Sequence, residues 1–178
     1  MTPKVVLQDI KKMVTDAVIV GIYEDERPLR GLAGELDWLL CGSLSRIVST
    51  GRLRGALGEA ALVASRGKIP ADKIFMIGLG SKQDIDLERI ESAVKAAALT
   101  AARAGAKSAA MAWPGGENIT IQKIVYAVAR GLEAAQCGGG VEFSVVAPNA
   151  ELYKELLVLS AADTPSSGAI HDTTLQQA

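Results

Sequence analysis

The spacing of apolar residues along this chain switches between two patterns, and each pattern predicts a different kind of element. Continuous, partly β-branched apolar runs at residues 17–23 and 73–80 predict strands that are covered on both faces. Shorter apolar runs predict four further strands, at residues 4–10, 59–65, 107–113 and 141–147. Glycine, proline or charged residues follow most of these runs and mark where each strand ends.

Helices are predicted where apolar residues recur every three or four positions. The longest such stretch covers residues 28–51, where Pro28 suits a first helical turn and Gly51 suits a C-terminal cap. It predicts one continuous amphipathic helix of about five turns. Three later helices are expected at about residues 87–105, 121–136 and 150–162, capped by Asp84 or Asp86, by Asn118 or Thr120, and by Asn149.

The resulting order of elements is β-β-α-β-β-α-β-α-β-α. Alternation of this kind predicts an α/β domain of three layers, with a mixed sheet flanked by helices. We expect the first two strands to pair, because no helix separates them. No break in composition occurs before about residue 162, so residues 1–162 are expected to form one domain and residues 163–178 a polar tail.

Composition narrows the class of protein. The 178 residues suit one domain, and 49% hydrophobic against 22% charged residues is typical of a globular chain. A net charge of −1 gives no general attraction to nucleic acid or membranes. No apolar run approaches the roughly 18 residues of a membrane span, and the charged N-terminus is unlike a signal peptide. We expect a cytoplasmic protein in which Cys41 and Cys137 are buried thiols within helices.

Few residues offer catalytic chemistry. The single histidine, His171, lies in the polar tail, where nothing places it against a nucleophile. The acidic residues 24–26 have no second cluster that would complete a metal site. We therefore expect no catalytic residue, no metal and no cofactor.

Several short segments, taken together and in order, are similar to a known family. They are EDERPLRG at 24–31, DWLLCG at 37–42 and LSR at 44–46, then Gly58-Glu59, Ile69-Pro70 and the run that ends in Gly78-Leu79-Gly80. Over roughly residues 15–160 this set resembles the N-terminal domain of leucyl, or cytosol, aminopeptidases. The resemblance implies a macrodomain-like fold.

The same resemblance implies a function without catalysis. In that family the two-metal peptidase site belongs to a separate C-terminal domain, whose Asn-Thr-Asp-Ala-Glu-Gly-Arg motif is not in this sequence. The N-terminal domain helps to build hexamers and in some members helps to contact DNA. The resemblance therefore implies a non-catalytic assembly or regulatory module, which self-associates or docks on a protein partner.

The loop after the second long apolar run is a candidate for binding an anion. It places Gly78, Gly80, Ser81 and Lys82 between a predicted strand and a predicted helix, where backbone N–H groups can point at a phosphate. It lacks the third glycine of a dinucleotide fingerprint and the ending of a P-loop. A macrodomain-like fold implies ADP-ribose or another nucleotide, here or at residues 114–118. A tight strand exit without a ligand is the competing explanation.

A basic region is a second candidate. Residues 41–70 contain five positive side chains and only one acidic side chain, that of Glu59. The five are Arg46, Arg52, Arg54, Arg66 and Lys68. If the fold brings them together, they would suit the phosphates of DNA or another anion. A solvated loop is the alternative.

Trp38 is a candidate for contact with a partner. It lies between Leu36 and Leu39, slightly off the apolar stripe of its predicted helix. A position at the edge of the core and a role as an interface anchor are both compatible with this pattern.

Overall fold

The computed structural model describes residues 3–112, 119–135 and 140–162, with side chains up to residue 158. Its strands are β1 Lys4–Val6, β2 Ala17–Tyr23, β3 Ala60–Ala64, β4 Lys73–Gly80, β5 Ser108–Ala112 and β6 Glu142–Val146. Its α-helices are α1 Gly31–Leu39, α2 Ser43–Ser49, α3 Leu87–Arg103, α4 Ile121–Ala134 and α5 Ala150–Ala162. Short 3₁₀ turns, η1 Ile10–Lys12 and η2 Lys82–Asp84, follow β1 and β4.

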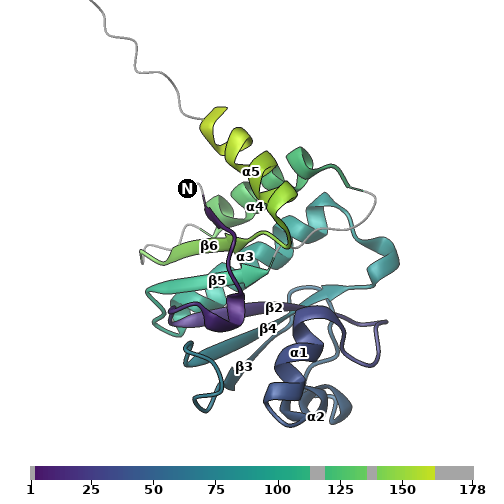
Figure 1. Ribbon diagram of the computed structural model, residues 1–178. Coiled ribbons are helices and arrows are strands. Elements are labelled where there is room, and N and C mark those ends of the chain that lie inside the picture. The colour runs from purple at the N-terminus through teal and green to yellow at the C-terminus, as the bar shows by residue number, and fades with distance from the viewer. Residues whose placement is uncertain (1–2, 113–118, 136–139, 163–178) are drawn as a thin grey trace, which may run out of the picture.

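Within the described residues the strands form one six-stranded sheet in the order β1-β6-β5-β2-β4-β3. All neighbours are parallel except β3 and β4, which form an antiparallel hairpin. The helices cover both faces of the sheet (Figure 1). The structure thus confirms the predicted α/β class and its mixed sheet.

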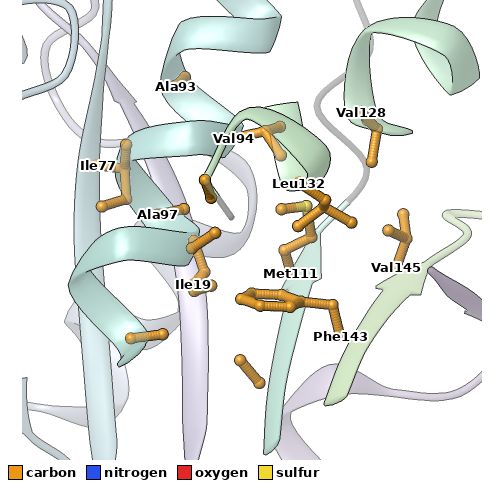
Figure 2. Packing of buried hydrophobic residues seen from close by; sticks show 14 of the residues in the cluster. Ile19, Ile77, Ala93, Val94, Ala97, Met111, Val128, Leu132, Phe143 and Val145 are labelled. Carbon is orange, nitrogen blue, oxygen red and sulfur yellow. The ribbon is translucent and has the colours of Figure 1, made fainter. Parts of the chain in front are cut away.

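One face of the sheet packs against α3 and α4. Figure 2 shows this layer, in which Val94 and Ala97 of α3 lie over Ile19 and Met111 of the sheet. The alanine-rich buried side of α3 lets the helix approach the sheet closely. At Gly131 of α4 a Cβ atom would lie 2.6 Å from a backbone oxygen of α3, so this glycine allows the two helices to touch.

The opposite face is covered by η1, α1 and α2. Leu36, Leu40 and Leu44 are buried there against Val18 and Val20 of β2. β2 therefore has a core on each side, which explains why its apolar run is continuous rather than alternating.

The predicted single helix over residues 28–51 is wrong, because the structure divides it in two. Cys41 and Gly42 have φ values of 52° and 77°, a left-handed conformation that no α-helix can continue through. Cys41 is also exposed, so the expectation of a buried thiol is wrong at this position, while Cys137 lies outside the described residues. The helical spacing continues across the break because α1 and α2 bury their leucines against the same face.

The expected pairing of the first two strands is also wrong. β1 pairs with β6 at the edge of the sheet, and the neighbours of β2 are β4 and β5. β1 is short and only partly buried, which suits an edge, whereas β2 needs a partner on both sides.

The first strand, predicted over residues 4–10, ends at Val6, and α1 begins at Gly31 rather than at Pro28. The caps of the later helices agree with the sequence. The side chain of Asp86 accepts the N–H of Arg89 at 2.8 Å and caps α3. Asn149 accepts the N–H of Leu152 at 2.8 Å at the start of α5. Thr120 occupies the N-cap position of α4, without a capping hydrogen bond from its side chain. The tail, the end of the predicted fifth strand and residues 114–118 lie outside the described residues.

Candidate functional site

The centre of the sheet provides a favourable place for a ligand. β2, β4 and β5 are parallel neighbours, so their carboxyl ends meet at one edge. From β2 the chain continues to α1 on one face, whereas β4 and β5 are followed by α3 and α4 on the other. Open α/β sheets bind ligands outside such a point of reversal.

A cleft of about 400 Å³ lies at this edge. Its walls come from the first turn of α1, the second half of β2, the end of β4, the middle of α3 and the end of β5. In the described part of the chain β5 pairs with β2 only as far as Ile19 and Met111, whereas β4 pairs as far as Tyr23. The side of β2 that faces β5 therefore borders the cleft beyond Ile19.

The inner wall of the cleft is aliphatic. Ile19, Ile77, Val94, Ala97 and Met111 line it, and each is almost fully buried. Figure 2 shows these side chains converging between α3 and the sheet.

Among the described residues that line the cleft, the charged side chains lie at its mouth. The ammonium group of Lys82 lies 2.7 Å from a carboxylate oxygen of Glu26 and 5.7 Å from the centre of the Tyr23 ring. Burial raises the pKa of Tyr23, so this phenol stays protonated and neutral at physiological pH. Arg30 is exposed at the same rim, and no hydrogen bond or ion pair of its side chain is described.

The loop that the sequence offers as an anion site already holds a carboxylate of the same chain. Asp25 accepts the backbone N–H of Lys82 at 2.9 Å and the hydroxyl of Ser81 at 2.8 Å. The Lys82 N–H lowers the pKa of Asp25 most, followed by the Ser81 hydroxyl. The sequence pattern located the anion-binding groups but not the acid that reaches them from the preceding loop.

The glycines of that loop have a structural explanation. A Cβ at Gly78 would lie 1.9 Å from the carbonyl oxygen of Ala56, and Gly80 has a φ of 76°. A tight strand exit therefore accounts for both residues. Binding of an external anion at Gly78, Gly80, Ser81 and Lys82 stays a prediction.

Trp38 projects from α1 into solvent, with 80% of its surface exposed. A position at the edge of the core does not fit this exposure. One groove beside it is formed with Pro28 and Leu29, and another with Lys68 and Ile69. Its role as an interface anchor stays a prediction.

The residues of the basic region come from three segments of the chain. Arg46 lies on α2, and Arg52 and Arg54 lie in the loop that follows it, before β3. Arg66 and Lys68 lie in the turn at the other end of β3. Lys68 also borders a groove with Ser45, the neighbour of Arg46 on α2. The three arginines that precede β3 are all exposed, and binding of DNA or another anion by them stays a prediction.

The described ranges contain neither a metal site nor a membrane-spanning helix. No group of three or more His, Cys, Asp or Glu residues in those ranges could hold a metal ion. None of their helices is both long enough and apolar enough to cross a membrane. His171 lies outside these ranges.

Comparison with known proteins adds relatives that are much longer than this chain. A probable cytosol aminopeptidase of Alkaliphilus oremlandii (strain OhILAs) is 33% identical over 90 residues, which are 51% of this chain and 18% of that protein. One from Geobacter sp. (strain M21) is 38% identical over 79 residues, 44% of this chain and 16% of that protein. One from Alkaliphilus metalliredigens (strain QYMF) is 28% identical over 130 residues, which are 72% of this chain and 26% of that protein. The chain thus spans about a quarter or less of these relatives.

Solved structures with the same fold come from two groups. A mutant of tomato leucine aminopeptidase superposes with a TM-score of 0.67 at 17% identity, covering 90% of this chain and 35% of that one. The Oceanobacillus iheyensis macrodomain with ADP gives a TM-score of 0.71 at 13% identity and covers 89% of each chain. The family model of the N-terminal domain of the cytosol aminopeptidase family matches residues 19–136. This chain therefore belongs to the cytosol aminopeptidase family through its N-terminal domain, and its fold is that of the macrodomains.

Proposed function

We propose that this chain is a non-catalytic docking module, which assembles with itself or with the catalytic part of a cytosol aminopeptidase. The observation that carries the proposal is the exposure of Trp38 between two grooves. A tryptophan exposed to this extent gains a large apolar burial when a partner covers it, and tryptophans are frequent hot spots of interfaces.

The family relation supports this reading. The match is to the N-terminal domain alone, and the relatives extend far beyond the matched region. A domain that forms part of a longer polypeptide needs a surface for contact with the remainder. The face around Trp38 is suited to that contact because its side chain can be buried without disturbing the core of the sheet.

The test compares the chain with its Trp38→Ala variant in sedimentation, alone and mixed with the catalytic domain of a cytosol aminopeptidase. We expect the unaltered chain to associate and the variant to associate at least tenfold more weakly. Leu62→Ala is a matched control, because Leu62 is also exposed but lies on β3. A chain that stays monomeric and binds no catalytic domain would refute the proposal.

A second candidate function is the binding of a small ligand in the cleft. Its volume falls within the range of known ligand sites, and it lies at the point of reversal of the sheet. Fold neighbours solved with ADP, from Oceanobacillus iheyensis and Trypanosoma brucei, suggest a nucleotide. Calorimetry with ADP and ADP-ribose tests this form, and absence of heat at millimolar concentration would exclude it.

A further inference from the structure

The cleft at the carboxyl edge differs in chemistry between its inner wall and its mouth. We propose that it binds a short aliphatic carboxylate, with the hydrocarbon chain against α3 and the carboxylate at Arg30 and the first turn of α1. This inference rests on the cleft being a ligand site, which is the second candidate function. It goes further by naming the chemical class of the ligand.

The inner wall of the cleft is apolar. Its buried side chains are Ile, Val, Leu, Ala and Met, without a hydrogen-bonding group among them. In the part of the chain that the structure describes, the only buried polar side chain is Ser65, which lies in the β3–β4 turn. A purine packed against these side chains would lose water at its polar edges without a replacement from them, at a cost of about 1–3 kcal/mol for each group. A hydrocarbon chain has no such cost and gains about 0.8 kcal/mol for each buried CH₂ group.

The mouth of the cleft has an excess of positive side chains among the described residues. Among the described residues that line the cleft, Arg30 and Lys82 are positive and Glu26 is negative. Glu26 and Lys82 form an ion pair with each other, which leaves the guanidinium of Arg30 as the net charge among the described lining residues. Arginine binds a carboxylate through paired N–H groups, which makes it a specific partner for an anionic head group.

The backbone at the rim favours the same sign of charge. Gly31, Leu32 and Ala33 form the first turn of α1 and line the cleft. The N-cap residue, Arg30, gives no capping hydrogen bond, and the first turn contains no acid. N–H groups at a helix start have no intrahelical partner, so a carboxylate beside Arg30 would meet donors as well as charge.

The experiment titrates the ¹⁵N-labelled full chain with four probes and follows its amide resonances. Hexanoate has both the hydrocarbon tail and the negative charge, whereas acetate has the negative charge without the tail. Hexylammonium has the tail with a positive charge, and ADP represents a nucleotide. We expect hexanoate to shift the resonances of residues 19–23, 31–33 and 93–97. Acetate and hexylammonium should bind at least tenfold more weakly, because each lacks one half of the interaction.

Two substitutions test the two halves of the site. Arg30→Gln should weaken hexanoate about tenfold, and Arg52→Gln, an exposed arginine outside the cleft, should leave the affinity unchanged. Ala97→Leu should abolish binding by filling the inner wall. If the Ala97→Leu variant does not fold, Arg30→Gln still tests the proposal, because Arg30 is exposed and its substitution leaves the core intact.

Each outcome is decisive. Binding of hexanoate that depends on Arg30 supports the proposal. If ADP binds and hexanoate does not, the cleft is a ligand site, but the proposal that its ligand is an aliphatic carboxylate is wrong. If hexanoate binds equally to the Arg30→Gln variant, or if no probe binds, the proposal is wrong, and in the latter case the second candidate function loses its support as well.

Discussion

At the scale of single residues, Gly78 shows how close packing of the backbone determines residue type. The loop of residues 55–56 crosses the end of β4 at this position, and the hydrogen bond from Gly58 N–H to Gly78 O, at 3.0 Å, holds it there. Any side chain would displace that loop, because the nearest obstacle to a Cβ is backbone rather than a flexible side chain.

We therefore expect Gly78→Ala to lower the free energy of unfolding by about 3 kcal/mol. Urea denaturation followed by circular dichroism measures the change. Gly67→Ala is the matched control. Gly67 has a φ of 72° but open space around it, so its substitution should cost only about 1 kcal/mol of backbone strain. Equal costs at the two positions would contradict this account.

At the scale of elements, the boundary between α1 and α2 depends on one carboxylate. Asp37, in α1, accepts the N–H groups of Leu44 and Ser45 at 2.8 and 2.9 Å and also the Ser45 hydroxyl. It thus caps α2 from the preceding helix, at a point where the local N-cap residue, Gly42, has no side chain to do so.

Asp37→Ala should lower the free energy of unfolding by about 1 kcal/mol, the usual cost of losing a capping side chain. Asp37→Asn should keep most of the stability, because its amide oxygen can still accept both N–H groups. Thermal unfolding of the two variants distinguishes the cases. An alanine variant as stable as the unaltered chain would show that the cap contributes nothing.

At the same boundary, a substitution of Cys41 is expected to raise the free energy of unfolding rather than lower it. Its positive φ places the Cβ atom in the crowded left-handed region, which glycine occupies without strain. Cys41→Gly should therefore raise the free energy of unfolding by about 0.5–1 kcal/mol, and Cys41→Val should lower it. Chemical denaturation under reducing conditions measures both changes. A loss of stability in the glycine variant would argue against strain at this residue.

At the scale of the whole molecule, Asp16 and Asp25 join segments that are far apart in the sequence by accepting backbone N–H groups, and Glu59 holds the loop before β3 in the same way. Asp16 accepts the N–H of Lys107 at 2.6 Å and joins the start of β2 to the start of β5. Asp25 joins the loops at the cleft, and Glu59 accepts N–H groups from residues 54–56. The hydrogen bond from Lys107 contributes most to lowering the pKa of Asp16, as those from Lys82 and Arg54 do for Asp25 and Glu59.

These shifts predict how stability depends on pH. A group whose pKa is lower in the folded protein than in the unfolded chain binds fewer protons when folded, so it stabilises the fold above its unfolded pKa of about 4. That stabilisation is lost as the pH falls through the folded pKa. Urea midpoints should therefore be nearly constant from pH 7 to 5 and decline below about pH 4.

Asp16→Asn tests the source of this decline. It should lower the midpoint at pH 7 and flatten the loss below pH 4, because the variant has no proton to take up at this position. Asp72→Asn serves as the control, since no hydrogen bond of the Asp72 side chain is described. A profile that is identical for the Asp16 variant and the unaltered chain would exclude this origin of acid sensitivity.

The sequence by itself determined the class of the fold, because its strongest signals are local. The buried runs of β2 and β4, the periodic stripes of α3 and α4, and the caps Asp86 and Asn149 depend on residues close in the chain, and the structure confirms them. The ordered segments between residues 24 and 80 identified the family for the same reason.

Contacts between distant residues were decided only by the tertiary structure. Spacing could not show that β1 pairs with β6, since pairing depends on the burial of every strand at once. Nor could it show that Asp25 reaches the loop at Ser81, or that Trp38 lies outside the core. The cleft has the same origin, because its walls come from segments up to about 90 residues apart that meet only where parallel strands end together.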